Sequence, residues 1–259
     1  MILDSVTHLP PAARGQAVLA ASHGGTYAAW YAARRGVAAV ILHDAGIGRA
    51  RAGVAGLDWL GARGVPAAAV GHDSARIGDG ADMAARGSLS TVNAPARALG
   101  LEPGMGCAAA LAILTKAGLP PAAVTEELGE ARQELAPGVV GLDSNGLVGP
   151  LDIGRIIVTG SHGGLLGGRP ETAVKAAVAG ALYNDAGIGI DRAGVSRLPA
   201  LAARGIPAAT LSCFSAEIGD ALSAWRDGIV SAVNAPAAAR GARIGITTQE
   251  FVALLLEHP

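Results

Sequence analysis

The chain has 259 residues, a net charge of −1, 51% hydrophobic and 16% charged residues, and a mean hydropathy of +0.39. This length can bury the core of one or two domains. The charges form no basic block, which argues against nucleic-acid binding, and no stretch approaches the roughly 18 consecutive apolar residues of a membrane span.

The expected setting is the cytoplasm. The N-terminal stretch MILDSVTHLPP has neither the basic nor the apolar region of a signal peptide. Two cysteines, Cys107 and Cys213, are too few for a disulfide framework and fit a reducing compartment. The high apolar content predicts a sheet covered on both faces together with a subunit interface, so we expect a homo-oligomer that acts on a small molecule.

The predicted strands fall into two matching series. The apolar runs GQAVLAAS (15–22), VAAVILHD (37–44) and VPAAAVGHDS (65–74) predict three strands, and GRIIVTGS (154–161), VAGALYND (178–185) and IPAATLSCFS (206–215) predict three more. Helical stretches such as 26–36 and 191–205 separate them. The final stretch, from residue 247, opens with a capping-box pattern from Thr247 to Glu250 and predicts a terminal helix.

Short motifs repeat in the same order along the chain. The tetrapeptide SHGG occurs at 22–25 and at 161–164, an offset of 139 residues, while DAGIG (44–48 and 185–189) and VNAP (92–95 and 233–236) recur at an offset of 141. A two-residue insertion in the Gly-rich segment after the second SHGG explains the change. The series indicates a tandem duplication.

The predicted organisation is therefore a first α/β repeat over 1–117, a linker helix over 118–138 and a second α/β repeat over 139–259. Strands that are apolar throughout and alternate with helices indicate parallel strands covered on both faces. The expected fold class is α/β, with tandem-duplicated βαβαβα units related by a pseudo-two-fold axis. They form either one three-layer, Rossmann-like sheet or two lobes.

Polar residues gather where the predicted strands end, which is where α/β proteins bind ligands. Four of the six histidines lie there (His23, His43, His72 and His162), whereas His8 lies in a Pro-flanked loop and His258 at the tail. One possible catalytic set takes a base, an orienting carboxylate and a hydroxyl from each repeat. Its members are His23, Asp44 and Ser74 in the first repeat, and His162, Asp185 and Ser215 in the second.

The SHGG segments predict a turn whose glycine N–H groups can approach an anion at a helix N-terminus. The alternative is a purely structural role, in which these residues form a tight turn with a serine cap. The aspartates of DAGIG, together with Asp79 and Asp220, can equally serve as helix caps, and Asn93 and Asn234 as the end of a helix or a turn. The expected substrate-binding residues are Ser22, Gly24, Gly25, His43, Arg76, Ser161, Gly163, Gly164 and Asn184.

Three functions stay open on this evidence. The first is a hydrolase acting on the carbonyl of a small amide, imide or ester that bears a carboxylate. The second is a cofactor-independent isomerase, racemase or lyase with His23 and His162 as paired bases, and the third is a small-anion binding module. We expect no cofactor, since no dinucleotide or P-loop motif is present. The histidines and carboxylates of the first repeat leave a divalent metal as the alternative.

Overall fold

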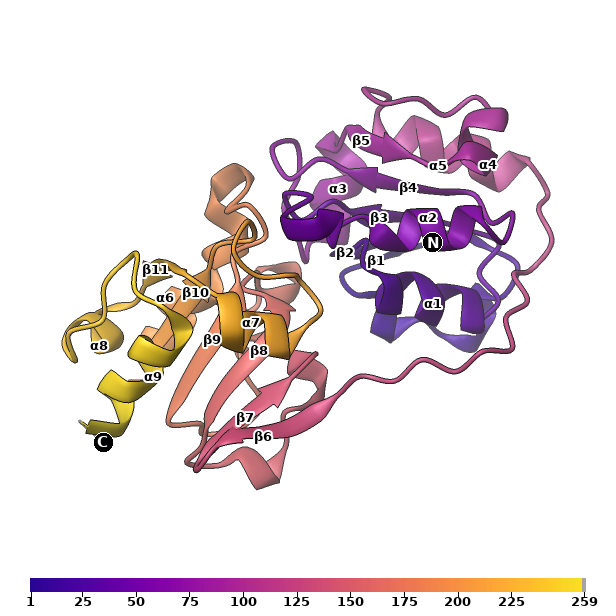
Figure 1. The fold of residues 1–259 in the computed structure, drawn as a ribbon. Coiled ribbons are helices and arrows are strands. Elements are labelled where there is room, and N and C mark those ends of the chain that lie inside the picture. The colour runs from indigo at the N-terminus through magenta and orange to yellow at the C-terminus, as the bar shows by residue number, and fades with distance from the viewer. Residues whose placement is uncertain (258–259) are drawn as a thin grey trace. The chain divides into compact units, whose positions relative to one another are not determined.

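The computed structural model describes residues 1–257, so His258 lies outside the described residues. The chain forms two compact units (Figure 1). Unit 1 is built mainly from residues 1–129, and unit 2 mainly from residues 130–257. Each unit contains one mixed, mostly parallel sheet flanked by helices, so the class is α/β with a Rossmann-like arrangement.

Unit 1 holds a five-stranded sheet in the order β1-β2-β3-β4-β5, in which only β5 is antiparallel to its neighbour. Its strands are β1 (Ile2–Leu3), β2 (Ala17–His23), β3 (Ala39–His43), β4 (Ala67–Val70) and β5 (Leu89–Val92). Its helices are α1 (Thr26–Arg34), α2 (Ala55–Gly61), α3 (Gly80–Arg86), α4 (Ala94–Ala98) and α5 (Cys107–Lys116).

Unit 2 holds a six-stranded sheet in the order β11-β10-β9-β8-β7-β6, with antiparallel strands at both edges. Its strands are β6 (Arg132–Ala136), β7 (Val139–Leu142), β8 (Ile156–His162), β9 (Gly180–Asn184), β10 (Ala208–Leu211) and β11 (Val230–Val233). Its helices are α6 (Arg197–Ala202), α7 (Ala221–Asp227), α8 (Ala235–Ala238) and α9 (Thr248–Glu257).

Both sheets are buried on both faces, as the uninterrupted apolar runs predict. In β3, Val40 and Leu42 face the core formed with α1 and α2, whereas Ala39 and Ile41 face the core formed with α3 and α5. The same alternation in unit 2 divides its strands between a core containing α6 and a core containing α7 and α9. All six strands predicted from apolar runs are therefore confirmed.

Two expectations about helices are wrong. Residues 119–131 form no regular structure, and the chain then enters β6, so the predicted linker helix over 118–138 is absent. The segment instead packs on unit 1: Ala122 is buried, and the Glu126 carbonyl accepts a hydrogen bond from Trp30 Nε1 at 2.8 Å. These tertiary contacts outweigh helix propensity, which is weak in a stretch that contains two prolines and a glycine.

The second SHGG does not open an α-helix. Residues Leu166–Gly168 and Pro170–Thr172 form 3₁₀ turns where unit 1 has α1. Gly167 and Gly168 adopt positive φ values of 57° and 68°, and Pro170 cannot continue a helix. Unit 2 therefore has no counterpart of helix α1 (Thr26–Arg34) at this place.

The helix caps agree with the sequence more closely. Thr247 Oγ1 accepts a hydrogen bond from the Glu250 N–H at 3.1 Å, and the Glu250 carboxylate accepts one from the Thr247 N–H at 2.7 Å, which confirms the capping box of α9. Asp79 and Asp220 cap α3 and α7, as one interpretation expected. Asn93 and Asn234 cap the N-termini of α4 and α8 rather than ending a helix.

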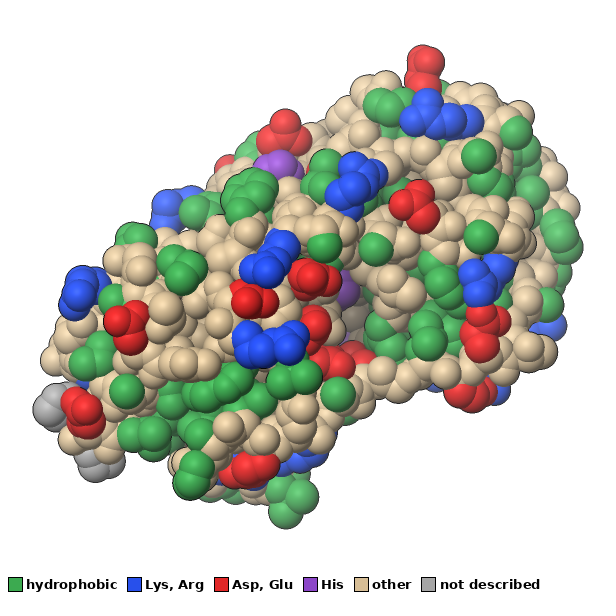
Figure 2. Space-filling model, in the orientation of Figure 1, with side chains coloured by type: hydrophobic (Ala, Val, Ile, Leu, Met, Phe, Trp, Pro, Cys, Tyr) green, Lys and Arg blue, Asp and Glu red, His purple; other side chains and the backbone are tan. Residues whose placement is uncertain are grey.

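Surface charge is mixed. On the face drawn in Figure 2, basic and acidic side chains occur in small groups among apolar ones, in keeping with the net charge of −1. Within residues 1–257, every helix is too short or too polar to cross a membrane.

Candidate functional site

The carboxyl ends of β2, β3 and β4 lie side by side in unit 1, because these strands are parallel neighbours. They carry His23, His43–Asp44 and the loop that begins at Gly71. The ends of β8, β9 and β10 carry the corresponding residues of unit 2. The two sets can therefore be compared residue by residue, each within its own unit.

The strand-end serines bond to neighbouring backbone. Ser22 Oγ accepts a hydrogen bond from the Val6 N–H at 2.9 Å, and Ser161 Oγ accepts one from the Asn145 N–H at 2.8 Å. Helix α1 begins after Gly25 and has no side-chain cap, so Ser22 does not cap it. Both serines hold the chain that precedes their strand, which favours a structural role over substrate binding.

The glycines of SHGG also bond within the chain. The Gly24 N–H donates to the His43 carbonyl at 2.8 Å, and the Gly163 N–H donates to the Asn184 carbonyl at 2.7 Å. A Cβ on Gly24 would lie 2.8 Å from the Gly53 carbonyl oxygen, so close packing requires glycine at this position.

His23 and His162 each accept an equivalent hydrogen bond from the backbone of their own SHGG segment. Nδ1 of His23 accepts from the Gly25 N–H, and Nδ1 of His162 accepts from the Gly164 N–H, both at 3.2 Å. A backbone N–H can only donate, so in a neutral ring the proton sits on Nε2. Burial, and to a lesser degree the neighbouring His43, lowers the pKa of His23 to about 4. His23 is therefore neutral at pH 7 and offers an Nε2–H donor.

His43 and Asn184 make the same pair of bonds. His43 Nδ1 accepts from the Ala45 N–H and Nε2 donates to the Ala75 carbonyl, both at 3.0 Å. Asn184 accepts from the Ala186 N–H at 2.9 Å and donates to the Ala216 carbonyl at 3.0 Å. Both side chains are buried, and burial lowers the pKa of His43. An amide replaces a neutral imidazole here without loss of a bond, which favours a structural role for both.

Asp44 and Asp185 connect two neighbouring strand ends. Asp44 Oδ1 accepts from the Gly46 and His72 N–H groups, each at 2.9 Å. Asp185 Oδ1 accepts from Gly187 at 3.0 Å and from Cys213 at 2.9 Å. The aspartates therefore serve as more than caps, because each ties the turn after one strand to the loop after the next.

Only unit 1 adds an imidazole to this arrangement. His72 Nδ1 lies 3.2 Å from Asp44 Oδ1; the His72 side chain is 34% exposed, whereas that of Asp44 is 3% exposed. Burial alone would raise the pKa of Asp44, but the hydrogen bond from His72, the nearby His43 and the Gly46 N–H hold the pKa below its ordinary value. A buried carboxylate thus orients a partly exposed histidine, and position 213 of unit 2 carries a buried cysteine instead.

The hydroxyls of Ser74 and Ser215 are engaged with backbone. Ser74 Oγ donates to the Gly71 carbonyl at 2.8 Å and accepts from the Ser88 N–H at 3.0 Å. Ser215 Oγ donates to Ser212 at 2.8 Å and accepts from Ile229 at 2.9 Å. Each serine closes the loop between the last parallel strand and the antiparallel strand that follows.

The expected triad is therefore not joined by hydrogen bonds among the described residues. Asp44 bonds to His72 rather than to His23, and Ser74 bonds to its own loop. Arg76, expected to bind substrate, lies at the surface near Asp79 and Asp82. The sequence placed His72 at a strand end without assigning it a role. The sequence feature that could have identified His72 is its replacement by Cys213 in the second repeat. The neighbouring aspartates, Asp44 and Asp185, are the same in both repeats.

In unit 2, where α1 has no counterpart, the side chain of a buried arginine of α6 binds the segment that follows β8. Arg197 is 3% exposed; Nε donates to the His162 carbonyl at 3.2 Å, and Nη1 donates to the Thr172 and Ala173 carbonyls. Its guanidinium also lies 5.1 Å from the centre of the Tyr183 ring. The corresponding residue in unit 1 is Gly56, where a Cβ would lie 2.5 Å from Ala29 of α1.

Residues 1–257 contain no group of three or more His, Cys, Asp or Glu side chains arranged to hold a metal ion. Comparison of the chain with protein families, with curated proteins and with solved structures finds no match.

Proposed function

We propose that the protein is a hydrolase of small amides, imides or esters, with an acid–base site at the carboxyl ends of β2–β4 in unit 1. The observation that carries the proposal is the contact between buried Asp44 and partly exposed His72. With Nδ1–H donated to the carboxylate, Nε2 is the basic nitrogen of the ring and can take a proton from water. His72 is then the general base and Asp44 its orienting partner.

His23 has a complementary role in this proposal. Its neutral ring carries the proton on Nε2, so it can hydrogen-bond a carbonyl oxygen on which negative charge develops. Strands β2 and β4 flank β3, so their ends lie about 10 Å apart, two strand spacings. A small substrate with an attacking water can span that distance.

A serine nucleophile has less support. The Ser74 hydroxyl already donates to one backbone group and accepts from another, so activation by a base would require the loop to open. The paired-base alternative has less support as well, because His23 and His162 both accept at Nδ1 and therefore present donors in the neutral state. Activation of a water molecule by His72 requires neither an opening of the Ser74 loop nor an acceptor nitrogen on His23 and His162.

The test measures hydrolysis of p-nitrophenyl acetate and of a panel of small cyclic amides and imides. We expect His72→Gln and Asp44→Asn to reduce the rate by about 10²- to 10⁴-fold, the usual contribution of a general base. Asp185→Asn is the matched control and should retain the rate, because Asp185 bonds to backbone N–H groups of unit 2. A wild-type rate in either unit 1 variant contradicts the proposal.

Ser74→Ala separates the two hydrolytic mechanisms. Under the proposed mechanism it retains turnover once its fold is verified. Loss of turnover, together with an acyl group trapped on Ser74 in the wild type, would establish the nucleophile instead. If no substrate in the panel is hydrolysed but a small anion stabilises the protein against heat, the binding module replaces the hydrolase.

We further infer that the chain arose by duplication of one α/β unit. The support is a set of equivalent hydrogen bonds at the sequence offsets: Ser22 matches Ser161, Asp44 matches Asp185, and His43 matches Asn184. Under this interpretation, unit 1 retained or gained the histidine beside its aspartate, and unit 2 carries cysteine there.

A further inference from the structure

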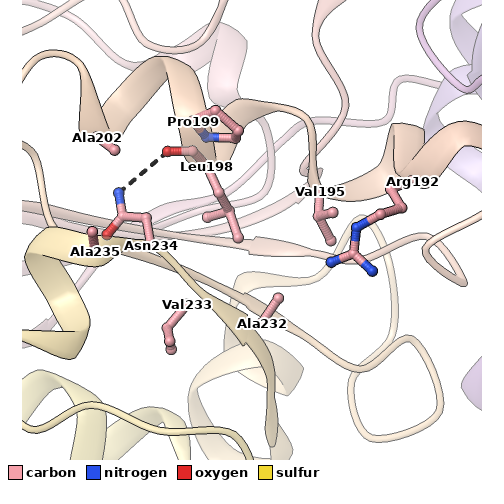
Figure 3. A pocket seen from close by; sticks show the side chains of 9 residues that line it. All are labelled: Arg192, Val195, Leu198, Pro199, Ala202, Ala232, Val233, Asn234 and Ala235. Atoms are coloured by element: carbon pink, nitrogen blue, oxygen red, sulfur yellow. Dashed lines mark hydrogen bonds between the residues drawn. The ribbon is translucent and has the colours of Figure 1, made fainter.

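Unit 2 contains a cavity of about 270 Å³ at the edge of its sheet (Figure 3). It lies between helix α6 on one side and β11 with the start of α8 on the other. Val195, Leu198, Ala202 and Ala232 supply much of the apolar lining. Val195, Leu198 and Ala232 also belong to the adjoining core, so the cavity extends that core outwards.

Small side chains and a proline create this space. The lining residues Pro199, Ala202 and Ala232 correspond, at the offset of 141, to Asp58, Gly61 and Thr91 of unit 1. Two of the three positions are polar in unit 1. The other six lining residues are identical in unit 1, so the lining of unit 2 is more apolar because of these positions alone.

The amide of Asn234 is fully used by the chain. Its Oδ1 accepts from Ala208 and Ala237, and its Nδ2 donates to Leu198 and Ile206. These four bonds hold the cavity wall in place. Asn234 therefore shapes the cavity, and its polar atoms are committed to the backbone.

Arg192 is the charged residue of the lining, and its guanidinium extends towards Val195 and Ala232 (Figure 3). It is exposed, and no described residue forms a hydrogen bond or ion pair with its side chain. An unpaired guanidinium beside an apolar surface matches a carboxylate that bears a hydrocarbon group, because the planar fork of Arg binds both oxygens.

We propose that this cavity binds a short-chain monocarboxylic acid, with the carboxylate on Arg192 and the hydrocarbon chain against Leu198, Ala202 and Ala232. The volume holds about nine water-sized groups at roughly 30 Å³ each, which fits an acid of about five to eight carbons. The lining favours a monocarboxylic acid, because a second carboxylate would meet apolar side chains and the Asn234 amide, which already bonds to the backbone, and would lose its hydration. This site is independent of the one proposed in unit 1.

The experiment titrates hexanoate into the full chain by calorimetry, with acetate, 1-hexanol and adipate as comparison probes. We expect hexanoate to bind, and the other three to bind at least about ten-fold more weakly, because each lacks the chain, the charge or the apolar end. Arg192→Gln should weaken hexanoate by about ten-fold or more, the usual effect of losing a charge-assisted hydrogen-bonded pair.

Arg51→Gln is the matched control, since Arg51 occupies the corresponding position of unit 1 with a similar positive φ, 58° against 56° for Arg192. It should leave hexanoate binding unchanged. Ala202→Leu fills the cavity from α6 and should abolish binding while urea unfolding remains cooperative. Failure of hexanoate to bind, equal loss in the Arg51 variant, or full binding by Ala202→Leu would each overturn the proposal.

Discussion

Replacement of His43 by asparagine should be tolerated, whereas replacement by leucine should not. The imidazole satisfies the Ala45 N–H and the Ala75 carbonyl, and it is 1% exposed. Leucine leaves both backbone groups without a partner, at about 1–3 kcal/mol each. Part of this is offset by the apolar surface that leucine buries, so we expect a net loss of about 2–4 kcal/mol.

His43→Asn should cost less than about 1.5 kcal/mol, the range for a substitution that preserves bonding but changes shape. The basis is Asn184, which makes the same two bonds in unit 2. The assay is urea unfolding followed by fluorescence in a Trp225→Phe background, which leaves Trp30 and Trp59 as reporters of unit 1. If the leucine and asparagine variants unfold within about 0.5 kcal/mol of each other, the reasoning is refuted.

Three further predictions follow from the same structure. Native His23 has a pKa of about 4 and unfolded histidine one of about 6.5, so the free energy of unfolding should decrease as the pH drops from about 6.5 to about 4. In urea titrations, His23→Asn should make this decrease smaller, and an unchanged pH dependence would disprove the pKa shift. Gly56→Ala places a Cβ 2.5 Å from Ala29 and should destabilise unit 1 by about 1–3 kcal/mol in thermal unfolding; an unaltered melting temperature would show that α1 moves aside freely. Asn234→Ala removes four buried hydrogen bonds and should cost about 3–5 kcal/mol, with faster amide exchange in α8; wild-type exchange rates would argue against this role.

The parallel strands β2, β3, β4, β8, β9 and β10 were predictable because strands buried on both faces are apolar throughout, whereas the parallel strands β1 and β7 were not predicted. The outer strands were not: β5 reads LSTV and β11 reads VSAV, and such short, half-polar runs resemble loops. The absence of a helix after the second SHGG was within reach, because Gly167, Gly168 and Pro170 each disfavour one. The extended course of residues 119–131 was not, since it depends on contacts such as Trp30 with Glu126.

For the candidate site, the sequence located the strand ends but not the partners of individual atoms. It could not show whether Asp44 orients His23 or His72, because the strands that these histidines end or follow, β2 and β4, both pair with β3, the strand before Asp44. It also could not show that the Ser74 hydroxyl is occupied, because that depends on the Ser88 backbone across the loop. Spacing along a chain predicts neighbourhood, whereas hydrogen-bond direction requires coordinates.

The order of the strands has a consequence for how the protein is made. In both sheets, every strand pairs with the strand that comes directly before or after it in the chain. No strand has to be inserted between two others that are already paired, so each parallel pairing needs only the one crossover connection that joins its two strands. Each sheet can grow at one edge while the polypeptide leaves the ribosome, and unit 1 can complete its sheet before β6 is synthesised.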